Sequence, residues 1–417
     1  MTETTALRRI ARDLAQTRFA ARAAGWDRTR EYCWRNVAEL TEAGLMGMTV
    51  PRALGGRGAS FLDACGVVEE IARVCTLTAR VVVEANMGAV STVMRYGSAA
   101  QKALWAELVL AGDKPAICIT EPDAGSAAGE MTTTARRVAG GYRLSGTKHW
   151  ITGGGISRLH LVFAQVEDGN GQRQGIGGFI VVADPARDAF PDGFTVVRRE
   201  RTMGLCGMPE AELRFAEVFV ADDMVLCPPS GFARGFADLM SAYNSQRVGA
   251  GTIAMGVAAG ALDHARRYLL AREQFGRPLA EFQGLQWMLA DMDTGVHAAR
   301  LLLEAAAASA DTAPNGFPDR TMAARAKLFA SETAVRVVND ALQMFGARGY
   351  SDAEPLERMA RDVRMFTIGG GTAQVLRTQI AGALLGIKTP QTREGYARLA
   401  EAPPATEPAP APILRAS

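Results

Sequence analysis

The spacing of apolar residues changes twice along the chain, and this change limits the possible folds more than any other sequence feature. Residues 5–110 and 232–387 carry apolar side chains every three or four residues, as at Val67 and Ile71, which is the period of an amphipathic helix. Residues 114–225 instead form short runs rich in Val, Ile, Phe and Thr between Gly, Asp and Asn. Such runs are typical of strands joined by tight turns. The sequence predicts an α+β protein with helical, β and helical parts.

Three structural units are expected, with boundaries at these changes. They are an N-terminal α-helical domain at residues 1–114, a middle antiparallel β domain at 115–231 and a C-terminal α-helical bundle at 232–390. Residues 391–417 are rich in Pro and Ala and are expected to be a disordered tail, because they have too little apolar surface to pack.

One long helix is predicted at residues 246–272. Small residues recur along it, including Gly256, Ala259 and Gly260. A position without a large side chain lets a neighbouring backbone approach closely. No linker or internal repeat separates the three units, so the sequence predicts one closely packed assembly.

Composition and charge exclude several classes of function. The chain has 46 Lys and Arg against 44 Asp and Glu, which gives no basic field to hold a nucleic acid. No apolar run has membrane-spanning length and no signal-peptide core follows the first residues, so a cytoplasmic protein is expected. The six cysteines and four histidines are dispersed, which predicts neither a metal cluster nor a disulfide framework.

Four motifs, in order and at the right spacing, resemble those of the acyl-CoA dehydrogenase family. They are residues 119–126 (ITEPDAGS), 146–154 (GTKHWITGG), 272–278 (REQFGRP) followed by Phe282 and Gln283, and 343–350 (QMFGARGY). One motif can occur by chance, but a single FAD site accounts for all four. The resemblance implies the acyl-CoA dehydrogenase fold, with a four-helix bundle as its C-terminal domain, a bound FAD and an acyl-CoA thioester as substrate.

The resemblance also implies which residues hold FAD. Thr120 and Thr152 would donate hydrogen bonds to the flavin, and Trp150 would cover one ring face. Arg272 is implied to reach the FAD of a neighbouring subunit, so a homotetramer or dimer would complete the site. The full set of implied cofactor residues is Ile117, Ile119, Thr120, Ser126, Trp150, Ile151, Thr152, Arg272, Gln274, Phe275, Gln283, Gln343, Gly346, Thr372 and Gln374.

The glutamate that serves as the catalytic base in most of the family is missing. Its motif, Y-E-G-T, corresponds here to residues 368–374 (IGGGTAQ), which place Gly370 at the base position. A few members carry the glutamate on the long helix just before an arginine, where this chain has Gln246 before Arg247. A neutral amide is a poor proton acceptor. The sequence therefore predicts that ordinary dehydrogenation is lost, unless an acid such as Glu84 has replaced the base.

Arg80 suggests an acidic group at the far end of the acyl chain. It lies four residues before Glu84, so one interpretation is a structural i, i+4 ion pair. However, the glutaryl-CoA dehydrogenase branch keeps an arginine at this place for the distal carboxylate of its substrate. A guanidinium offers the same planar fork to a carboxylate or a sulfinate, and we expect a short acyl-CoA with an acidic end.

Residues 239–251 and 278–288 resemble one branch, the 3-sulfinopropionyl-CoA desulfinases. These enzymes convert 3-sulfinopropionyl-CoA and water to propionyl-CoA and sulfite without net redox change. The resemblance implies that Arg80 holds the sulfinate, Gln246 orients substrate or water, and the Gly370 N–H fixes the thioester. The substrate-binding residues it implies are Arg80, Glu84, Ser126, Tyr243, Asn244 and Arg247.

Two other functions remain open from the sequence. One is a dehydrogenase of a dicarboxylic or branched acyl-CoA with a relocated base, which would need an electron-transfer flavoprotein as its partner. The other is a non-catalytic FAD- and CoA-binding protein that acts as a sensor or subunit. Intact FAD motifs count against the second.

Overall fold

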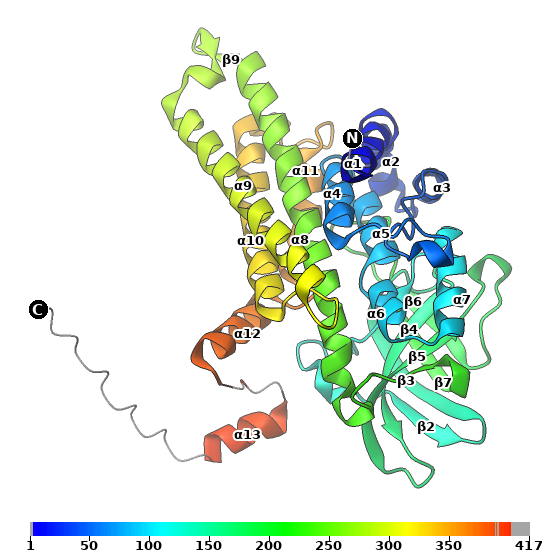
Figure 1. Cartoon of the computed structure of the whole chain (residues 1–417). Helices are drawn as coiled ribbons and strands as arrows, with labels where there is room; N and C mark the ends of the chain where they lie inside the picture. Colours follow the sequence, from blue (N-terminus) through cyan, green and yellow to red (C-terminus); the bar gives the residue numbers. More distant parts are fainter. Residues whose placement is uncertain (1–2, 388, 390–391, 402–417) are drawn as a thin grey trace, which may run out of the picture.

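The computed structural model describes residues 3–387, 389 and 392–401, and it shows helical, β and helical parts in the predicted order (Figure 1). The N-terminal helices are α1 (Glu3–Leu14), α2 (Ala20–Thr29), α3 (Trp34–Glu42), α4 (Phe61–Ala72), α5 (Thr76–Asn86), α6 (Ala89–Tyr96) and α7 (Ala99–Leu110). The sequence signal for α4 is its capping box. The Ser60 hydroxyl accepts from the Asp63 N–H, and the Asp63 carboxylate accepts from the Ser60 N–H, which satisfies two free donors of the first turn.

The middle domain is one sheet whose strands run in the order β6-β7-β3-β2-β4-β5-β8, with β1 beside β4. The strands are β1 (Ala116–Cys118), β2 (Thr134–Val138), β3 (Gly141–Thr152), β4 (Leu159–Glu167), β5 (Arg173–Val182), β6 (Phe194–Arg199), β7 (Glu210–Ala221) and β8 (Val225–Leu226). Most neighbours are antiparallel as predicted, but β1 and β2 each pair with β4 in parallel. The β2–β4 pairing is parallel because β3 reverses the chain once before β4 reverses it again.

The C-terminal domain is built from long helices. They are α8 (Phe232–Ala271), α9 (Gln283–Thr312), α10 (Arg320–Phe345), α11 (Leu356–Val363) and α12 (Ala373–Leu385), with the short strands β9 (Glu273–Gln274) and β10 (Arg277–Pro278) between α8 and α9. Helix α10 packs against α8, α9 and α12. The predicted helix at 246–272 is the larger part of α8, which begins earlier, at Phe232.

The segment predicted as a tail is described only in part. Residues 393–401 form helix α13 (Arg393–Glu401), and the remainder of 391–417, apart from residue 392, lies outside the described residues. Among the helices of the described part of the chain, none is long and apolar enough to cross a lipid bilayer.

Close packing of α8 on the N-terminal domain confirms the small-residue pattern. A Cβ atom at Gly260 would lie 2.1 Å from the carbonyl oxygen of Arg73, and one at Gly256 would lie 2.6 Å from the Ala72 Cβ. Buried Glu69 on α4 adds a link to α9, because it accepts hydrogen bonds from Arg300 of α9 at 2.8 Å and from Arg8 of α1 at 3.1 Å. The two helical domains therefore form one packed body.

Replacing Gly260 by Ala should lower the free energy of unfolding by about 1–3 kcal/mol, because the new methyl group overlaps a backbone carbonyl and the helices must separate. The matched control is Gly284→Ala in the first turn of α9, where nothing lies within 4 Å of the new Cβ. That control should be neutral or slightly stabilising. Urea unfolding of both variants tests the claim, and equal stability would contradict it.

Candidate active site

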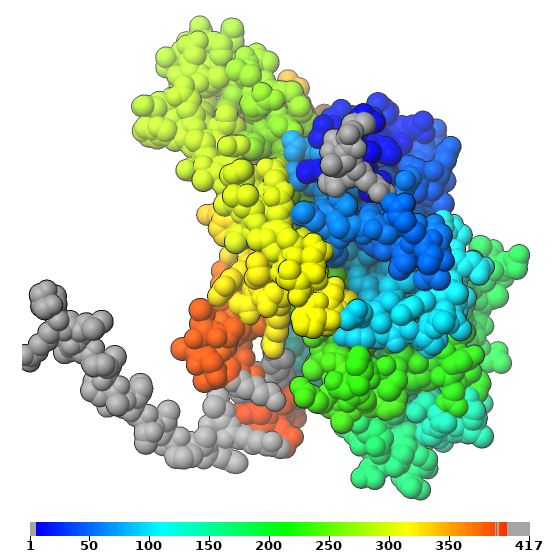
Figure 2. Space-filling model, viewed as in Figure 1, coloured from blue at the N-terminus to red at the C-terminus, as the bar shows by residue number. Residues whose placement is uncertain are grey.

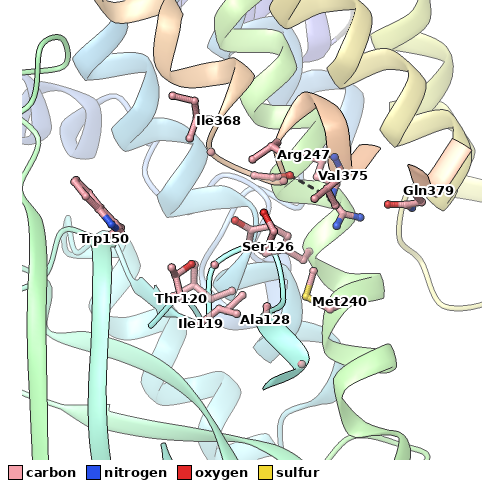
Figure 3. Close-up of a pocket in the computed structure, with 18 of the residues that line it drawn as sticks. Ile119, Thr120, Ser126, Ala128, Trp150, Met240, Arg247, Ile368, Val375 and Gln379 are labelled. Carbon is pink, nitrogen blue, oxygen red and sulfur yellow. Dashed lines mark hydrogen bonds between the residues drawn. The ribbon is translucent and has the colours of Figure 1, made fainter. Parts of the chain in front are cut away.

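A large cavity lies where the β domain meets the first half of α8 and the loop before α12. Its volume is about 1720 Å³. Figure 3 shows Ile119, Thr120 and Ser126 on the β-domain side and Arg247 and Ile368 on the helical side. Both domains therefore contribute to one site, and neither contains it alone.

Most of the predicted binding residues line this cavity. They are Arg80, Ile117, Ile119, Thr120, Ser126, Trp150, Ile151, Thr152, Tyr243, Asn244, Arg247, Gly370 and Thr372. They come from all three predicted domains, so the tertiary fold brings together residues that are far apart in the sequence.

The turn that carries Thr120 is held by a buried ion pair. Lys148 Nζ lies 2.8 Å from Glu121 Oε1 and donates to the Ile119 carbonyl at 3.0 Å. Glu121 also accepts from the N–H of Thr132 at 2.6 Å. Burial raises the pKa of the Glu121 carboxyl, but Lys148 and these hydrogen bonds outweigh it and bring the pKa to about 2. Glu121 is therefore an anion that fixes the cavity wall.

Trp150 presents an aromatic ring at the edge of the cavity. The residue is 53% exposed and its φ is +58°, a value that is unusual for a bulky side chain and is often found at functional sites. Its indole stacks on His149 with ring centroids 4.8 Å apart. The fold therefore holds a flat apolar surface toward solvent, where a planar ligand could lie on it.

His149 belongs to a polar group beneath Trp150. His149, Glu200 and Glu212 have ligand atoms within 4.8 Å of one another, a grouping that sequence spacing did not reveal. Arg198 approaches both carboxylates at 2.7 Å. The guanidinium compensates their charge, so the group acts as a support for the stacked rings.

Arg80 connects the cavity to a buried polar network. Its Nη2 lies 2.8 Å from Glu84 Oε1 and 3.4 Å from Thr152 Oγ1, and Gln246 Nε2 donates to the same Glu84 oxygen at 2.8 Å. The expected i, i+4 ion pair is therefore present. Glu84 and Gln246 are buried behind Arg80 and do not line the cavity. The Arg80 Nε has no hydrogen-bond partner among the described residues.

The loop that carries Gly370 is held by two cations. Arg247 Nε donates to the Gly370 carbonyl at 3.3 Å, and Lys327 Nζ donates to the Gly371 carbonyl at 2.6 Å. Gly370 has a φ of +74°, and the nearest atom to a Cβ there is Lys327 Cε at 3.8 Å. The position expected to hold a catalytic base therefore has room for a side chain and carries none.

Lys327 is buried and forms no ion pair with an acidic side chain of the described residues. Its relative exposure is 0%, and burial, with the positive charges of Arg247 and Arg80, lowers the pKa of its ammonium to about 7. Lys327 was not singled out in the sequence, although a lysine on the apolar face of an Ala-rich helix is a detectable signal. Glu210 and Lys114 both contact Thr152. The sequence analysis did not single them out, because neither belongs to a motif.

Arg247 also organises the helical wall. Its Nη1 donates to Asn244 Oδ1 at 2.7 Å, and its guanidinium lies 5.8 Å from the ring centre of Tyr243. Burial lowers the pKa of Arg247 to about 10, so the side chain is still a cation at neutral pH. The three residues form one polar surface facing the cavity.

The other predicted cofactor residues lie outside the cavity and are exposed. They are Arg272, Gln274, Phe275, Gln283, Gln343, Gly346 and Gln374. The end of α8, before Arg272, is roughly 36 Å from Arg247 along the helix axis. Within one copy of the chain, the structure therefore does not bring Arg272 to the cavity.

Comparison with known proteins places the chain in context. The N-terminal, middle and C-terminal domains of acyl-CoA dehydrogenases match residues 1–113, 116–218 and 233–385, respectively. The chain is 56% identical to a 3-sulfinopropanoyl-CoA desulfinase of Variovorax paradoxus, over 94% of this chain and 96% of the relative. It is 55% identical to the enzyme of that name from Advenella mimigardefordensis, over 94% and 96%.

Solved structures share the fold over nearly the whole chain. A glutaryl-coenzyme A dehydrogenase in complex with glutaryl-CoA has a TM-score of 0.86 at 29% identity, covering 93% of this chain and 96% of the other. Butyryl-CoA dehydrogenase from Megasphaera elsdenii has a TM-score of 0.85 at 31% identity, covering 92% and 99%.

Lys327 should make stability depend on pH. Its pKa is about 7 in the folded chain and 10.5 ordinarily, so the unfolded chain binds more protons between these values and stability contributed by this group rises with pH. From pH 7 to 9.5, wild type should gain up to about 3 kcal/mol relative to Lys327→Met. Urea unfolding at both pH values measures this, with Lys102→Met on α7 as control. A constant difference between wild type and Lys327→Met would contradict the assignment.

Proposed function

The chain belongs to the acyl-CoA dehydrogenase family, and we propose that it is a desulfinase that converts 3-sulfinopropionyl-CoA and water to propionyl-CoA and sulfite. The main support for this proposal is that the chain is 55–56% identical, over nearly its full length, to relatives that bear this name. The site supports it independently, because Gly370 and Gln246 leave both family base positions without a carboxylate. A site that lacks this base does not remove the α-proton of a bound thioester.

Arg80 supports an acyl group with an anionic end. It lines the cavity, and its Nη2 is anchored by Glu84 and Thr152. A guanidinium fixed in this way at the cavity surface suits a sulfinate or carboxylate group. Gln246 would act on the acyl group only indirectly, because its amide donates to the Glu84 oxygen that also anchors Arg80.

Glu84 is poorly placed to replace the missing base. Its Oε1 accepts a hydrogen bond from Gln246 and forms an ion pair with Arg80, and the side chain is 2% exposed behind the cavity wall. A base must come within hydrogen-bond reach of the proton that it removes. These contacts favour desulfination over a dehydrogenase that uses Glu84. An electron-transfer flavoprotein would be a partner only of the dehydrogenase.

The size of the cavity supports the binding of FAD together with an acyl-CoA. Its volume of about 1720 Å³ exceeds that of an ordinary single-ligand pocket. Trp150 would cover a flavin face, Thr120 would donate to the ring edge, and Ser126 would hold a pyrophosphate or pantetheine oxygen. When bound, the flavin supplies a planar ring system that can accept hydride. Tyr243, Asn244 and Arg247 would contact the CoA portion.

A homotetramer or dimer is proposed because part of the predicted FAD set lies far from the cavity. Phe275 is 93% exposed and Trp287 is 62% exposed at the end of the molecule where α8 meets α9. Figure 2 shows this end projecting from the body of the protein. Exposed apolar residues there suit contact with a second copy of the chain. This contact would bring Arg272 and Gln274 of one copy to the FAD of the other.

A cytoplasmic location, expected from the sequence, stays a prediction.

The purified yellow protein should release sulfite and propionyl-CoA in equal amounts from 3-sulfinopropionyl-CoA without an electron acceptor. Arg80→Lys keeps the charge but loses the planar fork, and it should reduce sulfite release roughly tenfold to a hundredfold. The control is Arg136→Lys on the exposed face of β2, where the guanidinium contacts Glu217. If wild type gives no sulfite but glutaryl-CoA bleaches its flavin, the protein is a dehydrogenase.

Gly370→Glu should restore part of the missing dehydrogenation. The cavity has space at this position, and the positive φ costs roughly 1–2 kcal/mol. Mixed anaerobically with propionyl-CoA, the variant should lose flavin absorbance, whereas wild type should not. Gly370→Gln is the matched control, because its side chain has the same size without a base. Equal bleaching by both variants would show that the carboxylate is not the missing element.

A further inference from the structure

A chain of polar contacts runs from the long helix to the β domain through the cavity wall. Gln246 Nε2 donates a hydrogen bond to Glu84 Oε1 at 2.8 Å, and Arg80 Nη2 forms an ion pair with the same oxygen at 2.8 Å. Arg80 Nη2 also donates to Thr152 Oγ1 at 3.4 Å. The Thr152 hydroxyl then donates to Glu210, at 2.9 Å from Oε1 and 3.0 Å from Oε2. Glu210 is the last member, and no motif predicted it.

Glu210 is placed where Arg80 would bring the anionic end of the acyl chain. It stands directly opposite Thr152 in the β3–β7 pairing, and Glu210, Thr152 and Arg80 all line the cavity. Among the described residues, the other carboxylate in the lining belongs to Glu394 on α13. Glu84, although close to Arg80, is behind the wall. Glu210 is thus the lining carboxyl group that is joined to Arg80 through the Thr152 hydroxyl.

The charges around Glu210 leave it able to hold a proton. Arg80 and Glu84 face it from α5, Lys114 from the segment before β1, and Tyr243 from α8. Burial raises the pKa of Glu210 to about 7, against the opposing effect of Arg80, the Thr152 hydrogen bond and Lys114, while Glu84 adds to the rise. A proton donor works best when its pKa is near the working pH. Burial likewise raises the pKa of the Tyr243 phenol, which makes it a weaker acid.

We propose that Glu210 is the catalytic acid that protonates the carbon from which sulfur departs, an assignment that rests on the proposed desulfinase function. The C–S bond breaks, and its electron pair forms the new C–H bond with the proton of the Glu210 carboxyl group. Sulfur leaves as sulfur dioxide. Water adds to the sulfur dioxide to give hydrogensulfite and a proton, which returns to the Glu210 carboxylate.

Each neighbour of Glu210 has a separate part in this step. Arg80 holds the sulfinate oxygens on one side of the Thr152 hydroxyl, while Glu210 occupies the other side. Glu84 and Gln246 are positioning residues, because they fix the Arg80 guanidinium and do not reach the cavity. Lys114 donates to the Thr152 carbonyl at 2.9 Å, so it fixes the backbone that aligns the hydroxyl. Positioning of this kind places donor and carbon together before the bond breaks.

The test measures sulfite release by wild type, Glu210→Gln and Glu210→Asp from pH 5.5 to 9. Glu210→Gln keeps the shape but has no transferable proton, so its kcat should fall roughly a hundredfold to ten-thousandfold with KM little changed. In wild type, kcat should decline as pH rises through and above about 7, because the acid form is lost. Glu210→Asp should recover part of kcat and keep this decline, and Glu210→Gln should lack it.

Glu217→Gln is the matched control, since Glu217 lies on the same strand with its side chain exposed, and its kcat and pH profile should be unchanged. Melting temperature and flavin absorbance verify that each variant is folded. If Glu210→Gln does not fold, the pH profile of Glu210→Asp decides the matter. A kcat within about threefold of wild type for Glu210→Gln, or a Glu210→Asp profile without the alkaline decline, would overturn the role of Glu210 alone. Absence of sulfite from wild type would instead overturn the desulfinase function itself.

Discussion

The close contact of α8 with the N-terminal domain is the constraint on which the site depends. Gly256 and Gly260 have no side chain to separate α8 from α4, and a Cβ atom at Gly249 would lie 2.5 Å from the sulfur of Met87. This short separation brings Gln246 within 2.8 Å of Glu84. Interiors are packed too densely to absorb added atoms without movement. The same contact therefore sets both the stability of the helical body and the direction in which Arg80 points.

In and behind the cavity wall, the fold gathers opposite charges that none of the domains could bury alone. Arg80 and Lys114 stand among Glu84 and Glu210, with Thr152 between them. A buried ion is costly unless its partners and hydrogen bonds are all present. Because these groups come from α5, from the segment before β1 and from β7, the network is complete only when the helical and β parts have docked.

Several of the residues predicted to bind the cofactor could be named from the sequence because they belong to motifs that resemble those of the family. Thr120, Ser126 and Trp150 sit in such motifs, and all three line the cavity. Sequence reasoning did not find Glu210, an isolated charged residue whose meaning depends on burial, and it overlooked Lys327, whose place on the apolar face of an Ala-rich helix can be read from the sequence. The parallel pairing of β4 with β1 and β2 was also missed, because alternation within a strand does not reveal the direction of its neighbour.

The sequence by itself determined the order of helical and β parts, the long helix with its small residues, and the loss of a carboxylate at Gly370 and Gln246. These features are local, so periodicity and motif spacing record them. Only the tertiary structure decided that Gln246 supports Glu84 behind the cavity and that Glu210 reaches the cavity beside Arg80. The physical reason is that burial and charge neighbours arise from residues distant in the chain, and these set both the direction of a side chain and its affinity for a proton.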